Sequence, residues 1–341
     1  MSDIDIRVAG RAGRITLNRP KALNALTYDM IRAIEAELDV WRDDDAIDLV
    51  VIDAAGDKAF CAGGDIADLY ASGRAGDFAF GQQFWRDEYR LNAKLAEFPK
   101  PIVSLMQGFT MGGGVGVGCH ASHRIVGDSS RIAMPECGIG LVPDVGGSLL
   151  LAQAPGFLGE YYGLSAARMG PGDAILMGFA DTYVPEVDWP ALIAALENGD
   201  VAGVAGFERV PPSAEIAEHR PMIDRIFAAN SLEEVGAGLT ADQTDFAATA
   251  LKAIQRNSPL SMACAMKLIR RVRRTPTIRE ALAQEYRFTH RATQFGDFLE
   301  GIRAAIIDKD RSPKWAHALG TVPGDAVDQM LAPLGDQALT F

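Results

Sequence analysis

Two glycine-rich turns are the segments of this sequence best suited to binding a reacting group. They are CAGGD at 61–65 and TMGGGVG at 110–116, and each follows a predicted strand and leads toward a helical segment. Glycine lets the backbone turn sharply and lets another group come very close, so such turns can present main-chain N–H groups. Two converging N–H donors would bind the oxygen of a polarised carbonyl, as in acyl chemistry. The sequence therefore predicts a carbonyl-binding site.

Glu136 and Asp144 are the candidate acid–base groups. They lie in SRIAMPECGIGLVPDVGG (130–147), a segment otherwise apolar and rich in glycine and proline. Apolar surroundings raise the pKa of a carboxyl group and can suit it to proton transfer. A second interpretation fits equally well, with Asp144 capping a turn and Glu136 starting a helix. The residues alone leave both interpretations open.

Other reaction classes lack their usual motifs. The sequence has no GK[ST] phosphate loop, no GxSxG elbow and no HExxH helix. His120 and His123 could face a metal from one helix, but no further ligand pattern completes a site, so we interpret them as non-ligating. GVGCHA at 116–121 matches a loose dinucleotide-binding form but does not follow its strand directly, so we do not expect NAD binding.

Composition narrows the class of protein further. The chain has 341 residues, 48% of them hydrophobic, and a formal net charge of -12. This charge opposes nonspecific binding to nucleic acid or to an anionic membrane. Four cysteines without a CxxC pair, and an acidic N-terminus without an apolar segment, favour a reduced, cytoplasmic protein without an export signal. The uncharged stretch 102–119 contains six glycines, so we predict a buried strand and turn there instead of a membrane helix.

Alternating strands and helices must position these residues. The segments 14–20, 48–56, 101–108, 124–127 and 130–136 are typical of strands, 57–66 of a loop, and 114–123 of a helix. A longer helix is predicted in TYDMIRAIEAELDVWRDD, with Thr27 as its cap. After Asp181 the pattern becomes all-helical and includes the amphipathic segment 261–294. We predict a layered α/β fold.

Four motifs in order resemble the crotonase (enoyl-CoA hydratase/isomerase) superfamily: ITLNRPKALNAL, KAFCAGGDI, GFTMGGGVG and MPECGIGLVPDVGG. The segment DFLEGIRAAIIDKDRSPKW at 297–315 is similar to the 3-hydroxyisobutyryl-CoA hydrolase branch. The resemblance implies an α/β spiral of ββα units. It places a core with the active site at 1–185 and a helical C-terminal region at 186–341 that covers the site or mediates assembly.

The resemblance also implies roles for particular residues. Gly64 and Gly113 match the positions whose N–H groups hold the thioester carbonyl, and Glu136 matches the acid of the PE motif. Hydratases of the superfamily carry a second glutamate where this chain has Gly116, which argues against hydratase activity. Glu136 and Asp144 then form the working pair.

The substrate contacts are implied in the same way. Glu88 matches a position that contacts the acyl part of the substrate, although an exposed helix glutamate is the alternative. Lys21 and Lys58 are candidates for binding the phosphates of coenzyme A, and Ala62 for lining the adenine pocket through its backbone. Coenzyme A is part of the substrate, so no separate cofactor and no metal are expected.

These inferences predict a thioesterase that converts 3-hydroxyisobutyryl-CoA to 3-hydroxyisobutyrate and CoA in valine degradation. Glu136 would either activate water or attack the carbonyl itself. The alternatives are an enoyl-CoA hydratase or isomerase of the same fold and a CoA-ester-binding protein without turnover. We expect a small-molecule acyl-CoA substrate, no nucleic acid, no membrane, and possible assembly into a homo-oligomer.

Overall fold

The computed structural model describes residues 2–341, which form two compact units. Both are built from separate stretches of chain. The strand unit comprises the chain up to Asp65, Arg90–Ala133 and Met169–Ala214. The helical unit comprises Ile66–Tyr89, Met134–Arg168 and Glu215–Phe341. The predicted core at 1–185 and C-terminal region at 186–341 are each one continuous stretch of chain, and this division stays a prediction.

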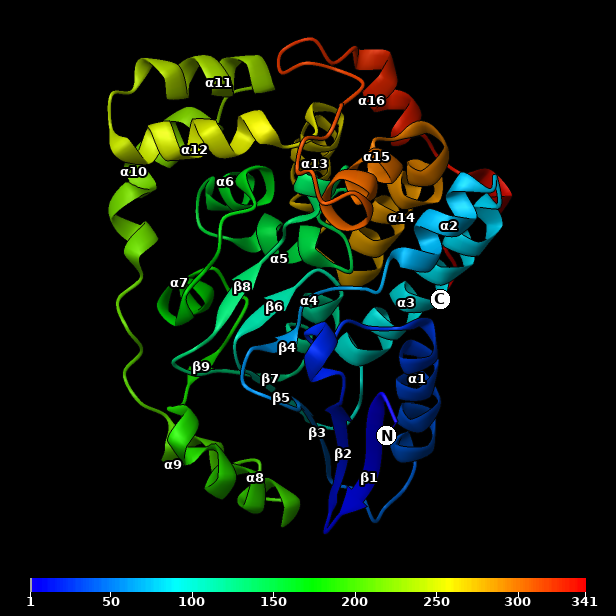
Figure 1. Cartoon of the computed structure of the whole chain (residues 1–341). Helices are drawn as coiled ribbons and strands as arrows, with labels where there is room; N and C mark the ends of the chain where they lie inside the picture. Colours follow the sequence, from blue (N-terminus) through cyan, green and yellow to red (C-terminus); the bar gives the residue numbers. More distant parts are fainter. Residues whose placement is uncertain (1) are drawn as a thin grey trace. The chain divides into compact units, whose positions relative to one another are not determined.

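Two sheets share the strands of the strand unit (Figure 1). The larger has the order β1-β2-β3-β5-β7-β9, and the smaller has the order β4-β6-β8. The bounds of the larger sheet's strands are Ile4–Ala9, Ala12–Leu17, Leu49–Ala54, Ile102–Met106, His123–Val126 and Thr182–Tyr183. Those of the smaller are Ala59–Cys61, Phe109–Met111 and Arg131–Ala133. All pairs are parallel except β1 with β2.

Successive strands alternate between the sheets. β3, β5 and β7 join the larger sheet, and β4, β6 and β8, which directly follow them, join the smaller one. The helices α2 (Ala67–Arg74) and α3 (Phe78–Ala96) come after β4, and α4 (Gly113–Gly118) comes after β6. This order of two strands and a helix confirms the predicted α/β fold of ββα units.

Four strands were not predicted, and the first is β1, which has six residues at one edge of the larger sheet. β4 lies in 57–66, which the sequence indicated as a loop, and β6 lies at the start of the glycine cluster. β9 lies just after Asp181, where an all-helical region was expected. β4, β6 and β9 have only two or three residues each, so none of these three is long enough to show the alternation that identifies a strand.

The central strands β3 and β5 are mostly apolar because the side chains on both of their faces are buried. Leu49, Val51, Val103 and Leu105 pack with Leu192 and other residues of α8 (Trp189–Glu197) in one buried cluster. Strands covered on both faces need no polar side.

The predicted long helix is α1 (Tyr28–Arg42), and Thr27 caps it by accepting a hydrogen bond from the Met30 N–H at 3.2 Å. The unit's other helices are α7 (Pro171–Leu176), α9 (Val204–Phe207), η1 (Pro20–Ala22) and η3 (Glu186–Asp188).

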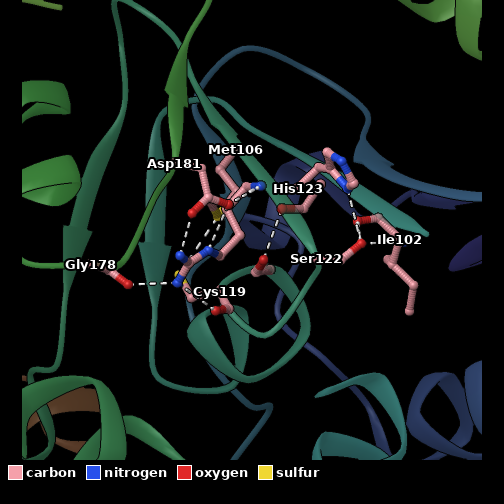
Figure 2. A network of polar contacts seen from close by, with 10 residues as sticks. Ile102, Met106, Cys119, Ser122, His123, Gly178 and Asp181 are labelled. Carbon is pink, nitrogen blue, oxygen red and sulfur yellow. Dashed lines mark hydrogen bonds and ion pairs between the residues drawn. The ribbon is translucent and has the colours of Figure 1, made fainter. Parts of the chain in front are cut away.

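Arg124 connects β7 to the turn before β9, where Gly178 and Asp181 lie (Figure 2). Its guanidinium binds the Asp181 carboxylate, with a 2.9 Å Nε–Oδ2 distance, and donates to the Gly178 carbonyl at 2.5 Å. In the same network His123 Nδ1 lies 3.0 Å from Ser122 Oγ.

Within residues 2–341 no group of three or more His, Cys, Asp or Glu side chains is placed to hold a metal ion. The GVGCHA segment begins inside α4, so it is not a turn between a strand and a helix.

The helical unit is formed around α13 (Pro259–Val272), which packs against α5 (Gly147–Gln153), α6 (Leu158–Ser165) and α14 (Ile278–Phe295). The predicted amphipathic segment 261–294 is therefore two helices, broken near Pro276. The unit also holds α2, the part of α3 up to Tyr89, and these elements: η2 (Glu136–Ile139), η4 (Glu215–His219), α10 (Arg220–Phe227), α11 (Leu232–Ala241), α12 (Asp245–Arg256), α15 (Phe298–Ile302), η5 (Arg303–Ile307), α16 (Gly324–Met330) and η6 (Gly335–Gln337). None of the helices described between residues 2 and 341 combines the length and the apolar character needed to cross a bilayer.

Candidate active site

Three predicted site residues lie buried together in the helical unit. Glu88 comes from α3, Glu136 is the first residue of η2, and Asp144 lies in the loop between η2 and α5. Each is only 4% exposed. Glu88 is therefore not the solvated helix glutamate considered as the alternative, because the structure buries it and places it near enough to Asp144 for the two charges to interact.

Asp144 is oriented by a tyrosine on α3. The Tyr89 hydroxyl donates a hydrogen bond to Asp144 Oδ2 at 2.7 Å. The same Tyr89 oxygen lies 3.3 Å from Thr289 Oγ1 on α14. One carboxylate oxygen is thus fixed by a buried hydroxyl, which sets the direction in which the other oxygen can act.

Burial makes these carboxyl groups unusually weak acids. It raises the pKa of Asp144 to about 7, and the Tyr89 hydrogen bond opposes part of that rise. It also raises the pKa of Glu136 and of Glu88 well above the ordinary range, and the nearby charge of Asp144 adds to both shifts. Carboxyl groups that exchange protons near neutral pH are suited to general acid–base catalysis.

Glu136 differs from Asp144 in having a buried oxygen without a partner. Its Oε2 makes no hydrogen bond to any residue between 2 and 341. Leaving a buried carboxylate oxygen unbonded is costly, so native proteins do so at few positions. An acceptor held free in an apolar site can take a proton from a reacting molecule.

Glu285 on α14 belongs to the same cluster, and it was not predicted from the sequence. Its side chain is 0% exposed, and it binds Gly146 and Ser148, both close to Asp144 in the chain. Burial raises its pKa to about 8. A signal was present in the sequence, because position 285 is three or four residues from the apolar residues Ala281, Leu282 and Phe288 and so falls on the apolar stripe of the helix. An acid on such a stripe indicates a buried, partnered carboxylate.

The two predicted carbonyl-binding amides lie at neighbouring turns of the strand unit. Gly113 is the first residue of α4, so its N–H has no acceptor within the helix. The Leu26 N–H donates to the Gly63 carbonyl, and the Asp65 N–H donates to the Leu26 carbonyl. The N–H of Gly64 takes no part in this pairing. Neither amide donates to another residue in the described part of the chain. Both are available to an oxygen acceptor.

Glycine is required at these turns for two physical reasons. Gly112, directly before Gly113, has a φ of 50°, in the region that glycine enters most readily. At Gly114 a Cβ atom would lie 2.2 Å from the carbonyl oxygen of Cys61. The glycine cluster therefore lets α4 begin directly against β4.

The structure also brings together the two lysines predicted to bind coenzyme A. Lys21 and Lys58 line one cavity of about 250 Å³ in the strand unit, with Asn24 beside them. Ala62 does not line this cavity, and its N–H donates to the Leu23 carbonyl at 3.0 Å. Two cations at one cavity can hold a phosphate, whereas the role of Ala62 stays a prediction.

Two interleaved sheets of ββα units, together with a buried carboxylate cluster, define an α/β enzyme of the crotonase fold. The chain belongs to the enoyl-CoA hydratase/isomerase family, whose model matches residues 12–331. Its curated relatives include the mitochondrial 3-hydroxyisobutyryl-CoA hydrolases of Gallus gallus, 36% identical over 99% of this chain and 91% of that protein, and of Rattus norvegicus, 39% identical over 97% and 89%.

Solved structures agree on the fold along the whole chain. A structure described as an enoyl-CoA hydratase from Rhodobacter sphaeroides is 60% identical, with a TM-score of 0.97 over 100% of both chains. One described as a carnitinyl-CoA dehydratase from Mycobacterium thermoresistibile is 40% identical, with a TM-score of 0.96 over 100% of this chain and 99% of that one.

Proposed function

We propose that the protein hydrolyses 3-hydroxyisobutyryl-CoA to 3-hydroxyisobutyrate and free CoA. Two observations support this reaction. The relatives named as 3-hydroxyisobutyryl-CoA hydrolases align along nearly the whole chain. The buried pair Glu136 and Asp144 supplies carboxyl groups with raised pKa values, and a hydrolase needs such groups to activate water.

The unpartnered Oε2 of Glu136 is the observation that carries the mechanism. In the proposed reaction this oxygen takes a proton from water, and the water oxygen bonds to the thioester carbon. The carbon–sulfur bond then breaks, and its electron pair leaves with the CoA thiolate. A thiol pKa of about 8.5 makes this thiolate a good leaving group. Asp144, held by Tyr89, orients the water or the substrate hydroxyl and carries protons.

Substrate binding follows from the remaining predicted residues. The proposal assigns the thioester oxygen to the N–H groups of Gly64 and Gly113, where negative charge develops as the carbonyl is attacked. It assigns the acyl group to Glu88 and the CoA phosphates to Lys21 and Lys58. No cofactor besides the CoA of the substrate enters this scheme.

A hydratase is the second candidate, because the solved structure that is 60% identical is described as an enoyl-CoA hydratase. Hydration needs a second carboxyl group at the position of Gly116, which has no side chain and is buried in α4. The geometry therefore favours hydrolysis. A protein that binds CoA esters without turnover is the third alternative.

One assay separates these candidates. The purified protein is mixed with 3-hydroxyisobutyryl-, 3-hydroxypropionyl- and crotonyl-CoA, and both free thiol and enoyl absorbance are followed. We expect thiol release from the hydroxyacyl esters and no hydration of crotonyl-CoA. Loss of the enoyl absorbance without thiol would establish a hydratase, and binding without either change would establish the non-catalytic alternative.

Turnover in ¹⁸O-water distinguishes a base from a nucleophile at Glu136. With Glu136 as the base, heavy oxygen enters the released acid and the Glu136 side chain stays unlabelled. Label in the peptide that contains Glu136 would show that this carboxylate attacks the thioester and that water opens the anhydride at the protein's own carboxyl carbon.

The cellular setting is also part of the proposal. We place the reaction in valine degradation, in the cytoplasm, although the named relatives are mitochondrial proteins. Accumulation of the thioester during growth on valine after loss of the gene would support the pathway, and cell fractionation tests the compartment. Light scattering of the purified protein tests the proposed homo-oligomer.

A further inference from the structure

We propose that Glu285 is a positioning residue that holds the loop carrying Asp144 in its working conformation. The inference rests on the proposed hydrolase function, because Asp144 is assigned its role there. Glu285 lies on α14, 141 positions after Asp144 in the chain numbering. Its effect on the reaction would therefore be exerted through the loop and not through contact with the substrate.

The contacts of Glu285 are with the main chain just after Asp144. Its Oε2 accepts a hydrogen bond from the Gly146 N–H at 2.8 Å, and its Oε1 accepts one from the Ser148 N–H at 3.0 Å. The Ser148 hydroxyl also bonds to Oε1. One fully buried carboxylate thus satisfies three donors at the start of α5.

The loop needs such support because its backbone is strained. Val145, between Asp144 and Gly146, has a φ of 52°, which is a rare conformation for a β-branched residue. Strained residues of this kind persist only where the surrounding contacts hold them. The bond from Gly146 to Glu285 begins one residue after the strained position, so it opposes relaxation of Val145.

The same helix supports the Asp144 side chain by a second route. Thr289 follows Glu285 by one helical turn, and its Oγ1 lies 3.3 Å from the Tyr89 oxygen that bonds to Asp144. One face of α14 therefore contacts both the chain that follows Asp144 and the hydroxyl that orients its carboxylate. A change at Glu285 disturbs the loop while leaving the Tyr89 side chain intact.

The substitution Glu285→Gln tests the proposal with little change in volume. A glutamine offers one acceptor oxygen, and its NH₂ group cannot accept a bond from a main-chain N–H. At least one of the two amide bonds is lost. We expect kcat for thiol release to fall by about 10²-fold, the effect of a displacement near 1 Å, while KM changes little.

Glu160→Gln is the matched control. Glu160 is also fully buried in the helical unit, where it binds Arg273 at 2.8 and 2.9 Å and Arg270 at 3.4 Å, and none of these bonds is to the Asp144 loop. Both variants lose bonds to a buried carboxylate, so a general loss of stability affects both. Only Glu285→Gln is expected to lower kcat and to speed hydrogen exchange in the peptide that covers residues 144–150.

The outcomes separate the proposal from the proposed function. A folded Glu285→Gln protein with parental kcat, or an equal fall of kcat in both variants, overturns the positioning role. If Glu285→Gln does not fold, Ser148→Ala removes one bond to the same carboxylate, and unchanged kcat and exchange there overturn the role as well. A parent protein that releases no thiol refutes the hydrolase function, whereas the exchange comparison still decides whether Glu285 holds the loop.

Discussion

Glu136 and Asp144 are equally buried, yet their contacts assign them different tasks. Asp144 gives one oxygen to Tyr89, whereas Glu136 keeps a buried oxygen without a partner in the described part of the chain. The residue with the free acceptor is the one placed to take a proton. The two positions should therefore respond differently to the same chemical change.

Replacing each acid by its amide measures this difference. Glu136→Gln removes the proton acceptor, and we expect kcat to fall by about 10²–10⁴-fold, the usual contribution of a general base. Asp144→Asn should lower kcat less, because its partner Tyr89 remains. Thiol release at saturating substrate is the measurement. Binding of a non-hydrolysable CoA thioether by calorimetry is the control, and a fully active Glu136→Gln protein would exclude both catalytic roles of Glu136.

The pH profile of Asp144→Asn gives a further test. The negative charge of Asp144 raises the pKa of Glu136, so its removal should lower that pKa. A base works when it is deprotonated, and therefore the acidic limb of kcat/KM should move to lower pH in the variant. The limb is measured from pH 5 to pH 9. A limb that stays in place or moves to higher pH would contradict the assigned interaction.

For single residues, the sequence predicted which side chains belong to the site better than it predicted their burial and their neighbours. Glu136, Asp144 and Glu88 could be named from their motifs, but burial and mutual distance depend on segments far apart in the chain. Glu285 could not be assigned to the site because its partners, Gly146 and Ser148, lie on another element. Only folding brings α14 against that loop.

The glycine turns belong to the scale of elements, since α4 and β4 hold them in place. Gly113 is the first residue of α4, a position at which proline is well tolerated because the missing N–H has no acceptor in the helix. Gly113→Pro therefore removes the predicted donor and keeps the helix. We expect a fall of about 10²–10³-fold in kcat for thiol release.

Gly113→Ala is the matched control for this variant. Alanine keeps the N–H and adds only a methyl group. If Gly113→Pro is folded by circular dichroism and hydrolyses the substrate at the rate of Gly113→Ala, the N–H of Gly113 does not bind the thioester oxygen.

Most elements of the strand unit could be predicted because they are long or apolar. β3 and β5 are mostly apolar runs, and α1 begins at a threonine cap. The strands β4 and β6 have three residues each, and tertiary pairing defines them, since each depends on its neighbours in the smaller sheet. Local sequence carries too little of that information.

The whole molecule should become less stable as its buried acids are forced to ionise. A carboxyl group whose pKa is raised by folding binds more protons in the folded state than in the unfolded one. The free energy of unfolding then falls as pH rises from the unfolded pKa of about 4. For Asp144 the fall ends near its folded pKa of about 7, and for Glu285 near about 8.

Glu136→Gln should therefore be more stable than the parent, and the difference should be larger at pH 8 than at pH 5. The variant has no charge to bury, whereas the raised pKa of Glu136 penalises the parent at pH 8. A gain of ~1 kcal/mol corresponds to a rise in Tm of about 2–4 °C for a domain of 150–250 residues. Calorimetry at both pH values measures it, and Glu218→Gln, at an exposed position, is the control. An equal difference at both pH values would contradict this account.

The interleaved order of the two compact units has a consequence for synthesis on the ribosome. The strand unit contains residues from the start of the chain and residues up to Ala214, and the helical unit begins at Ile66 and includes the last stretch from Glu215. The early strands therefore leave the ribosome long before β9 can complete their sheet. Until then the last strand of the incomplete sheet has one edge without a neighbour, and unpaired edges of this kind attract other chains. Nascent chains that stall between residues 66 and 214 should thus depend most strongly on chaperones.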